Sequence, residues 1–347
     1  MIAAGGTAGH VVPALAVAEA LRAEGAEVAF IGGERAEAEL VGAAGFPLHA
    51  ISVEGLDRSS PVRAMRALVL AAAALPRARA LLKQIAPDAV MGGGGYVAGP
   101  VGLAALTLRI PLLLTEADSR LGLTNRMLAP FARRVCLAFA LPGRSGSRYR
   151  VTGRPIPPLG GDRRVARERL GIAPDESCVL VFGGSLGARS INLAASEAFA
   201  GAPFRVLHVS GRRDYAELSQ REPSAGYDLI EYLALADFAD ALAAADLVVA
   251  RAGGSVFEIA AHGLPAILVP YPHASGDHQS ENARWMSEGG AAVTIPDAEL
   301  TAARLLAETV ALLKDTARLA AMASASRGLA RPEAASEVAR ELLEAAA

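Results

Sequence analysis

Apolar and polar residues alternate in a regular way along this chain. Short apolar runs end at glycines, and each is followed by an Ala- and Leu-rich stretch in which apolar residues recur every three to four positions. Such a repeat of strand, turn and helix is typical of an α/β protein with a parallel sheet covered by helices. The expected strands are Val28–Ile31, Ala89–Met91, Pro111–Leu114, Val135–Leu137, Val179–Phe182, Phe204–Val209, Leu247–Ala250 and Ala266–Val269. The expected helices are Val11–Glu24, Ala36–Ala44, Pro61–Gln84, Leu121–Leu128, Arg163–Leu170, Ile191–Ala200, Phe257–Ala261, Ser280–Glu288, Ala302–Lys314 and Glu333–Ala346.

Glycine clusters recur at matching places in the two halves of the chain. The first half has Gly5–Gly9 near its start and Gly92–Gly95 after an Asp-led strand. The second half has Gly183–Gly187 after a strand and Gly253-Gly254 after another Asp-led strand. Two doubly wound domains with corresponding parts explain this repetition most simply.

A proline-rich segment, residues 153–161, is the expected linker, because prolines restrict the backbone and often mark a boundary. We therefore expect an N-terminal domain over residues 1–153 and a C-terminal domain over residues 162–330. Residues 331–347 are expected to form a final helix that packs back on the N-terminal domain.

Length and composition are those of a folded protein with two domains. The chain has 347 residues, of which 52% are hydrophobic and 20% charged, so a large core can form. Lys and Arg total 34 against 36 for Asp and Glu, and the net charge of -2 argues against a nucleic-acid binder driven by general electrostatics. Cys136 and Cys178 lie in apolar runs and are expected to be buried free thiols.

The start of the chain shows no signal peptide, and no uncharged apolar stretch reaches the roughly 18 residues that a membrane-spanning helix needs. If Gly5-Gly6 ends the first strand, that strand has only about four residues, whereas buried parallel strands are usually longer. This favours a natural start a few residues upstream.

A glycine loop between a strand and a helix can bind an anion, because its N–H groups and the positive end of the helix face the same point. Gly183–Gly187 has this context, and Ser185 adds a hydroxyl suited to a phosphate. The loop lacks the lysine of a P-loop, and neither loop matches G-x-G-x-x-G, which disfavours NTP hydrolysis and an NAD enzyme. A tight turn that needs small residues is the structural alternative.

His10 lies just after the first loop, in the opening turn of an expected helix. A helix N-terminus disfavours the imidazolium, so we expect a neutral ring that suits a general base or a hydrogen-bond partner. A helix-start residue with a satisfied hydrogen bond is the alternative.

Two polar segments of the second half also allow two interpretations. Ser255 and Glu258 have the spacing of a capping box, but a carboxylate at this place also suits the hydroxyls of a ribose. Residues 277–282 open a helix with the sequence Asp-His-Gln-Ser-Glu-Asn, and they are either a solvated loop or ligands of a sugar diphosphate.

Taken together, these segments resemble the MurG family, the peptidoglycan N-acetylglucosaminyltransferases that convert lipid I to lipid II. The matching stretches follow in family order along nearly the whole chain. They are Gly5-Gly6-Thr7-Ala8-Gly9-His10-Val11-Val12-Pro13-Ala14-Leu15, Gly92-Gly93-Gly94-Gly95-Tyr96-Val97-Ala98-Gly99-Pro100, Gly183-Gly184-Ser185-Leu186-Gly187-Ala188-Arg189, Arg251-Ala252-Gly253-Gly254-Ser255, Glu258-Ile259-Ala260-Ala261, Gly263-Leu264-Pro265-Ala266, Asp277-His278-Gln279 and Asn282-Ala283.

The resemblance implies a GT-B fold, in which two Rossmann-like doubly wound parallel-sheet domains face each other across a cleft. It implies UDP-N-acetylglucosamine as donor, an undecaprenyl-diphosphate-linked muramyl pentapeptide as acceptor, and inversion at the sugar C1 with no cofactor and no bound metal. The sequence has no Asp-x-Asp motif placed to hold a metal diphosphate. The resemblance further implies a peripheral enzyme at the cytoplasmic face of the cell membrane, on an anionic surface and among cell-wall synthesis proteins.

The resemblance also implies a role for single residues. By position, Ser185 contacts the donor diphosphate, Glu258 the ribose and Gln279 the donor sugar or diphosphate. The first loop and His10 serve the acceptor diphosphate and its reacting hydroxyl, and Asp118 is the second candidate for the base. The expected donor-binding residues are Arg154, Gly184, Ser185, Leu186, Leu233, Gly254, Ser255, Glu258 and Gln279. The expected acceptor-loop residues are Thr7, Ala8, Gly9, Gly94 and Tyr96.

Several positions depart from the family pattern. Ala8 replaces the usual glycine at the centre of the first loop, and the usual His-Glu-Gln-Asn run reads Thr115-Glu116-Ala117-Asp118. Asp118 therefore stands where the family has an asparagine that touches the donor sugar. Pro157 stands where the family has an arginine near uracil, and Arg154 is the expected substitute. The segment before Glu258 is one residue shorter. These departures concern the choice of donor sugar more than the fold.

Basic residues surround an apolar expected helix, which suits the surface of an anionic membrane. Arginines at five positions flank four apolar residues: Arg58, Arg63, Arg66, Arg77 and Arg79 around Leu68, Val69, Leu70 and Leu75. An ordinary amphipathic helix is the alternative.

Two rival classes of function stay open. One is another GT-B enzyme, such as a glycolipid glycosyltransferase or a UDP-sugar epimerase. The other is a non-catalytic two-domain protein that binds a sugar or a nucleotide. Donor screening separates the enzymes from one another, and UDP release in the presence of acceptor separates an enzyme from a binding protein.

Overall fold

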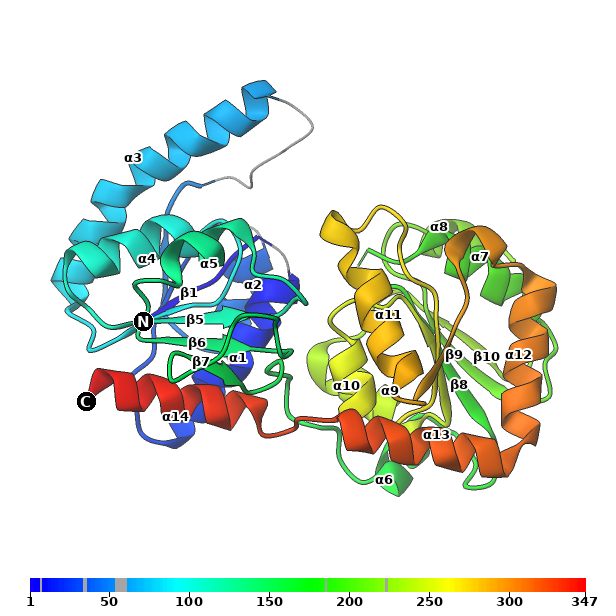
Figure 1. Ribbon diagram of the computed structural model, residues 1–347. Helices are drawn as coiled ribbons and strands as arrows, with labels where there is room; N and C mark the ends of the chain where they lie inside the picture. Colours follow the sequence, from blue (N-terminus) through cyan, green and yellow to red (C-terminus); the bar gives the residue numbers. More distant parts are fainter. Residues whose placement is uncertain (7, 34–35, 54–60, 185, 222–223) are drawn as a thin grey trace. The chain divides into compact units, whose positions relative to one another are not determined.

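The structure, a computed structural model, describes residues 1–6, 8–33, 36–53, 61–184, 186–221 and 224–347. The chain divides into two compact units, each built around its own sheet (Figure 1). The N-terminal unit contains residues 1–157 together with 331–347, and the C-terminal unit contains residues 158–330. The first passage from one unit to the other lies inside the proline-rich segment.

Within the described residues, the N-terminal unit has seven parallel strands in the order β3-β2-β1-β4-β5-β6-β7. These strands are β1 (Ile2–Ala3), β2 (Phe30–Gly32), β3 (Leu48–Ala50), β4 (Val90–Gly92), β5 (Leu112–Glu116), β6 (Arg134–Leu137) and β7 (Tyr149–Val151). The helices of this unit are α1 (Ala8–Ala23), α2 (Ala36–Ala43), α3 (Pro61–Ile85), α4 (Ala98–Thr107), α5 (Leu123–Leu128) and α14 (Ala334–Ala346).

Successive residues of these strands point to opposite faces of the sheet, so the sheet serves two cores. Val90 and Leu112 pack with α3, α4 and α5, whereas Met91 and Leu113 pack with α1, α2 and α14. Figure 1 shows α4 and α5 on one side of the sheet and α1 and α14 on the other. Because helices cover both faces, the central strands β1 and β4 and the first half of β5 are apolar without alternation, as is usual in a parallel sheet.

Helix α14 completes the core of the N-terminal unit from the far end of the chain. Its residues Val338 and Leu342 are buried in the cluster that includes α1. Its Glu341 accepts hydrogen bonds from Arg134 at 2.7 Å and from Arg150 at 3.2 Å. The last helix is thus joined to the first unit by both packing and charge.

Within the described residues, the C-terminal unit has six parallel strands in the order β10-β9-β8-β11-β12-β13. These strands are β8 (Cys178–Phe182), β9 (Arg205–Val209), β10 (Tyr227–Ile230), β11 (Leu247–Ala250), β12 (Ala266–Leu268) and β13 (Ala292–Thr294). The helices are α6 (Arg163–Arg169), α7 (Arg189–Ala198), α8 (Tyr215–Leu218), α9 (Leu235–Ala244), α10 (Val256–Ala261), α11 (His278–Glu288), α12 (Ala302–Lys314) and α13 (Thr316–Leu329), with 3-10 turns η1 (Ser275–Asp277) and η2 (Asp297–Glu299).

Two layers of helices also cover this second sheet. Val179 and Val249 pack with α7, α12 and α13 on one face. On the other face, Phe182 meets Phe238 of α9 edge to face, with ring centroids 4.9 Å apart.

The strand order of each sheet reverses once, between β1 and β4 in the first unit and between β8 and β11 in the second. At such a reversal the connections leave in opposite directions, and a crevice opens at the carboxyl ends of the strands. The four glycine clusters found in the sequence follow β1, β4, β8 and β11. Every one of them therefore lies at a reversal point.

The structure confirms the doubly wound architecture and corrects several element boundaries. The first helix begins at Ala8 rather than Val11, and β2 begins at Phe30 rather than Val28. Several elements were not expected from the sequence: β3, β7, β10, β13, α4, α8, α9 and α13. In the described part of the chain, no helix combines the length and apolarity needed to cross a bilayer.

The two cysteines are buried and free, as expected. Burial raises the pKa of Cys136 and of Cys178 to about 12, so both stay protonated and unreactive near neutral pH.

Candidate functional site

Two glycine loops touch each other at the carboxyl edge of the N-terminal sheet. A Cβ on Gly95 would lie 2.1 Å from the carbonyl oxygen of Gly5, so the loops after β4 and β1 are in direct contact. Gly94 and Gly95 have positive φ angles of 91° and 74°, which favour glycine. A Cβ on Gly94 would lie 2.7 Å from Cδ2 of His10. The imidazole of His10 therefore lies against the pair of loops.

The other predicted acceptor-loop residues that the structure describes lie at the same edge. Ala8 and Gly9 begin α1, and His10 is its third residue and is half-buried. The ring of Tyr96 lies against Gly6, where a Cβ would be 2.8 Å from its Cε1. Thr7 lies outside the described residues. The predicted acceptor site is thus one place in the fold, although its residues come from two segments of sequence.

A buried carboxylate that the sequence analysis missed holds the first loop. Glu37 of α2 is fully buried and accepts a hydrogen bond from the N–H of Gly33 at 2.8 Å. Its two oxygens also accept from the N–H of Gly6 at 3.3 and 3.4 Å. A Cβ on Gly5 would lie 2.6 Å from Oε1, so the backbone must be glycine for this approach. Glu37 joins the turn after β1 to the turn after β2.

Glu37→Gln is expected to lower the free energy of unfolding by about 2 kcal/mol. The glutamine amide has the same shape as the carboxylate, but its NH2 group cannot accept a hydrogen bond. One of the backbone N–H groups of Gly6 and Gly33 is then left without an acceptor. Urea denaturation followed by circular dichroism measures the change. Glu39→Gln on the exposed face of the same helix is the control, with an expected change within about 0.5 kcal/mol. Equal stability of the two variants would contradict the role given to Glu37.

A second buried carboxylate holds the loop that contains Asp118. Glu116 ends β5 and accepts from the N–H of Gly122 at 2.7 Å, Nδ2 of Asn125 at 3.0 Å and the N–H of Asp118 at 3.2 Å. The pKa of Glu116 is raised above its ordinary value, because the effect of burial is larger than the opposite effect of these hydrogen bonds. The backbone of half-buried Asp118, the second candidate base, is therefore held in place by Glu116.

Arg154 lies in the N-terminal unit and contacts the first glycine loop. Its Nη2 donates a hydrogen bond to the carbonyl oxygen of Gly9 at 2.6 Å. The contact between Arg154 and a uracil ring, expected from the sequence, stays a prediction.

The end of the second glycine loop, after β8, is packed against the loop after β9. A Cβ on Gly187 would lie 2.0 Å from the carbonyl oxygen of Ser210, and the φ angle of Gly187 is 80°. A Cβ on Gly183 would lie 2.3 Å from the Cβ of Ala188. Neither glycine can be replaced without moving the loop, because backbone atoms cannot give way as a flexible side chain does.

The middle of the same loop is open. Gly184 has a φ angle of 92°, and a Cβ there would meet no described atom within 4 Å. Leu186 exposes 69% of its surface. Ser185, between them, lies outside the described residues. The loop therefore has a fixed end at Gly187 and accessible residues, Gly184 and Leu186, before helix α7.

The loop after β11 is held by helix α11. Asn282 is buried and donates to the carbonyl oxygens of Ala252 at 3.0 Å and Gly253 at 3.4 Å. Gln279 is the second residue of the same helix. Its Oε1 accepts from the N–H of Tyr271 at 2.9 Å, and its Nε2 is 3.9 Å from the Cβ position of Gly253. Two segments that the sequence analysis assigned to the donor are thus adjacent.

The capping hydrogen bond predicted for the side chain of Ser255 is absent from α10. Ser255 is the N-cap of α10, but its backbone is already helical, with φ −62° and ψ −14°, and its side chain makes no capping hydrogen bond. A capping serine has an extended backbone, which aims its oxygen at the free N–H groups. Glu258 is half-buried, one turn further along the helix.

A buttress of three side chains, also missed in the sequence, lies beside these loops. Arg251 donates to Asp297 at 2.6 Å and to the hydroxyl of Ser190 at 2.7 Å, and Ser190 donates to Asp297 at 2.6 Å. Partial burial raises the pKa of Asp297, but the hydrogen bonds from Ser190 and Arg251 outweigh it and hold this pKa below its ordinary value. The buttress ties the segment after β11 to α7 and η2.

The predicted donor residues other than Arg154 belong to the C-terminal unit. Gly184 and Leu186 follow β8, Gly254 and Ser255 follow β11, and Gln279 lies on α11. Leu233, half-buried, follows β10. Among the residues that the structure describes, no cluster of His, Cys, Asp or Glu side chains has the geometry to hold a metal ion.

Known proteins match this chain over both units. Residues 1–137 match the glycosyltransferase family 28 N-terminal domain, and residues 178–338 match the glycosyltransferase family 28 C-terminal domain. A protein of Rubrobacter xylanophilus is 44% identical over 337 residues, 95% of this chain and 98% of its own length. One of Moorella thermoacetica is 40% identical over 365 residues, 99% of this chain and 98% of its own length. Both are named UDP-N-acetylglucosamine--N-acetylmuramyl-(pentapeptide) pyrophosphoryl-undecaprenol N-acetylglucosamine transferase.

A solved structure agrees with the sequence matches. The crystal structure of MurG from Acinetobacter baumannii has a TM-score of 0.77 and 32% identity, and the alignment covers 99% of this chain and 98% of that one. Two parallel sheets with their glycine loops at the reversal points fit the same fold. The chain belongs to glycosyltransferase family 28 and, within it, to the MurG family of transferases with the GT-B fold.

Proposed function

We propose that the protein transfers N-acetylglucosamine from UDP-N-acetylglucosamine to the muramyl 4-hydroxyl of lipid I, which gives lipid II, with inversion at C1 of the donor sugar. Membership of the MurG family supports this activity. The structural observation that supports it most is the pair of glycine loops at the reversal point of each sheet. Donor and acceptor are both diphosphates, and each unit offers backbone N–H groups for one of them.

The C-terminal unit is the proposed donor site. N–H groups around Gly184, with the positive end of α7 behind them, suit the donor diphosphate, and Ser185 adds a hydroxyl. Glu258 is the proposed ligand of the ribose hydroxyls, and Gln279 of the sugar or the diphosphate. Asn282 and the buttress of Arg251, Asp297 and Ser190 hold the adjoining loops in place.

The proposed reaction is a direct displacement. The acceptor oxygen attacks the anomeric carbon, the bond from that carbon to the diphosphate oxygen breaks, and its electron pair leaves with UDP. Negative charge grows on the diphosphate, where preorganised N–H groups stabilise it. The proton of the acceptor hydroxyl passes to a base, for which His10 is the first candidate, since its ring lies against Gly94 in the proposed acceptor loops. The proposed chemistry uses no cofactor and no metal ion in the active site.

Transfer of labelled N-acetylglucosamine from UDP-N-acetylglucosamine to lipid I tests this function. We expect labelled lipid II and one UDP released per sugar transferred, and much slower transfer from UDP-galactose or UDP-glucose. Equal transfer from UDP-galactose would contradict the donor assignment. Conversion of the donor to another UDP-sugar without acceptor would indicate an epimerase. Binding without UDP release would indicate a binding protein.

We propose that helix α3 brings the enzyme to the cytoplasmic face of the cell membrane, where a lipid-linked acceptor and other cell-wall synthesis proteins are found. Met65 and Val69 lie one helical turn apart and expose 62% and 60% of their surfaces. Arg66 and Arg77 on the same helix are exposed as well. An apolar strip beside basic residues suits an anionic surface. Arg58 and the side chains of Arg63 and Leu68 lie outside the described residues.

The double variant Met65→Asp and Val69→Asp is expected to bind vesicles at least about tenfold more weakly than the natural chain. Loss of one buried apolar side chain costs about 1.5–3 kcal/mol, and two acidic groups add repulsion from anionic lipid. Co-sedimentation with vesicles of phosphatidylglycerol and phosphatidylethanolamine measures the change. Val151→Asp, at an exposed valine of β7, is the control and should bind as before. Unchanged binding of the double variant would show that Met65 and Val69 of α3 do not contribute to membrane binding.

A further inference from the structure

Three polar side chains, two of them fully buried and one half-buried, form a chain of hydrogen bonds from β10 to helix α7 in the C-terminal unit. The hydroxyl of Tyr227 lies 2.6 Å from Nδ1 of His208, and Nε2 of His208 lies 3.0 Å from Oδ1 of Asn192. His208 and Asn192 are fully buried. We call these three residues the polar relay. None of them belongs to the proposed ligand-binding set, yet a buried polar network is costly unless each member is satisfied.

The hydrogen bonds of the polar relay have one direction. Nδ2 of Asn192 donates to the carbonyl oxygen of Ser210 and to the carboxylate of Asp214, both at 2.8 Å, so its Oδ1 accepts from His208. Burial lowers the pKa of His208 to about 4, so its ring is neutral near pH 7. Nε2 of His208 is then protonated and donates a hydrogen bond to Asn192, and Nδ1 accepts a hydrogen bond from the hydroxyl of Tyr227. The relay therefore has a single arrangement of donors and acceptors.

The polar relay ends on backbone that touches the second glycine loop. The Ser210 oxygen that Asn192 holds is the atom 2.0 Å from the Cβ position of Gly187. A Cβ on Gly211 would lie 2.2 Å from the backbone nitrogen of Gly187. Nδ2 of Asn192 is itself 3.2 Å from the Cβ position of Gly187. Asn192, Ser210 and Gly211 therefore pack closely against the backbone of Gly187.

We propose that Tyr227, His208 and Asn192 are positioning residues for the donor diphosphate and act through Ser210 on the second glycine loop. The proposal rests on the proposed donor site in that loop. N–H groups that are in place before the donor binds stabilise the leaving diphosphate without reorganisation, and a rigid supporting shell keeps them there. A relay with one arrangement of hydrogen bonds provides that rigidity.

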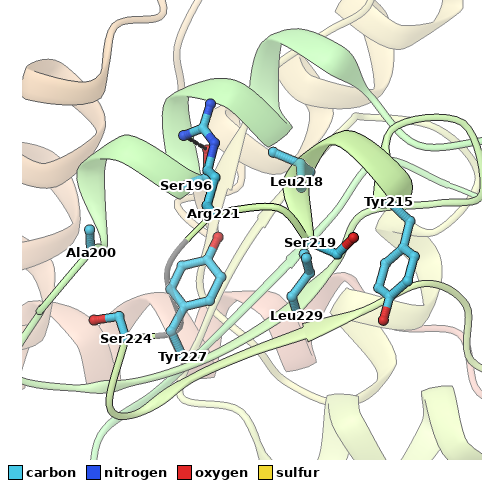
Figure 2. A pocket seen from close by; sticks show the side chains of 9 residues that line it. All are labelled: Ser196, Ala200, Tyr215, Leu218, Ser219, Arg221, Ser224, Tyr227 and Leu229. Atoms are coloured by element: carbon cyan, nitrogen blue, oxygen red, sulfur yellow. Dashed lines mark hydrogen bonds between the residues drawn. The ribbon is translucent and has the colours of Figure 1, made fainter.

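Tyr227 also lines a pocket of about 230 Å³ beside α7 and α8 (Figure 2). Figure 2 shows Tyr227 and Tyr215 at opposite sides of this pocket. The guanidinium of Arg221 donates a hydrogen bond to the hydroxyl of Ser196 at 2.7 Å. Tyr215 is not a member of the polar relay. The pocket thus offers two tyrosines for the same substitution, one inside the relay and one outside it.

Calorimetric titration with UDP, together with kinetics on UDP-N-acetylglucosamine and lipid I, tests the proposal. Tyr227→Phe leaves Nδ1 of His208 without its donor, so Kd for UDP and KM for the sugar donor should rise about tenfold while KM for lipid I is unchanged. Tyr215→Phe should leave all three values unchanged. If Tyr227→Phe lowers only the melting temperature and the fraction of active enzyme, with the same Kd for UDP, the proposal is wrong.

Two replacements of His208 show whether the polar relay itself is needed. Glutamine has an N–H that can donate to Asn192 and an oxygen that can accept from Tyr227, whereas leucine is apolar throughout. His208→Gln should bind UDP more tightly than His208→Leu. Equal Kd values for the two would contradict the proposal. If the unaltered protein fails to bind UDP, the proposed donor site is wrong, and this outcome is distinct from a failure of the relay alone.

Discussion

Replacing His10 by alanine is expected to lower kcat about 100- to 10,000-fold while KM for UDP-N-acetylglucosamine stays the same. Alanine removes the proposed base and leaves the proposed donor residues of the C-terminal unit, such as Gly184, Glu258 and Gln279, unaltered. The first glycine loop should keep its shape, because Glu37 and Gly95 hold its backbone independently of the imidazole. Steady-state kinetics with lipid I measures the effect. An unchanged kcat would exclude His10 as the base.

Two further variants separate the candidates for the base. His49→Ala, on β3 of the same unit, is the control for loss of an imidazole and should retain full activity. Asp118→Asn keeps the shape of the side chain and restores the asparagine of the family. If Asp118 contacts the donor sugar, this variant should be active; if Asp118 is the base, its kcat should fall by the factor expected for His10→Ala.

Gly187→Ala is expected to raise KM for the UDP-sugar about 100-fold, since an active-site group displaced by about 1 Å costs that much in rate or binding. The new Cβ would lie 2.0 Å from the carbonyl oxygen of Ser210, a separation that neither backbone segment can accept. The φ angle of 80° adds a strain of about 1–2 kcal/mol for a residue with a side chain. KM for lipid I should be unaffected, because the proposed acceptor loops belong to the N-terminal unit.

Gly171→Ala separates backbone strain from the close contact at Gly187. Gly171 has a φ angle of 65°, and a Cβ there would meet no described atom within 4 Å. Its substitution should therefore lower stability by about 1–2 kcal/mol and leave KM unaltered. A similar KM for both variants would show that the contact between Gly187 and Ser210 does not determine the shape of the donor loop.

The sequence predicted the architecture and the location of the glycine loops because both depend on local patterns. An apolar run before Gly183 and a helical period after it identify a strand, a turn and a helix without knowledge of the rest of the fold. The match between the two halves then predicted two similar domains. That Gly5 and Gly95 touch could not be read locally, since the contact depends on which strands are neighbours in the sheet.

Helix α4 and the roles of Glu37 and Arg251 were missed because they depend on partners distant in sequence. Helix α4 contains Gly99, Pro100 and Gly102, which read as helix breakers, yet a Cβ on Gly102 would lie 2.7 Å from the side chain of Leu128. Close packing therefore selects a glycine within a helix, against its intrinsic propensity. The partners of Glu37 and Arg251 lie up to 31 and 61 positions away along the chain. The capping box failed for a local reason, because the turn before Ser255 makes its backbone helical too early.

Helix α14 has a consequence for the order in which the protein can fold. The chain passes through the whole C-terminal unit before it returns to supply Val338 and Leu342 to the first core. During synthesis, the apolar surface of residues 1–157 that α14 covers in the folded protein stays exposed until α14 has been translated. A chain cut after Ala330 would retain every glycine loop and still leave the first unit incomplete. The N-terminal unit is therefore translated first but completes its core last, after the C-terminal unit. A chaperone that binds exposed apolar surface during translation would bind the N-terminal unit.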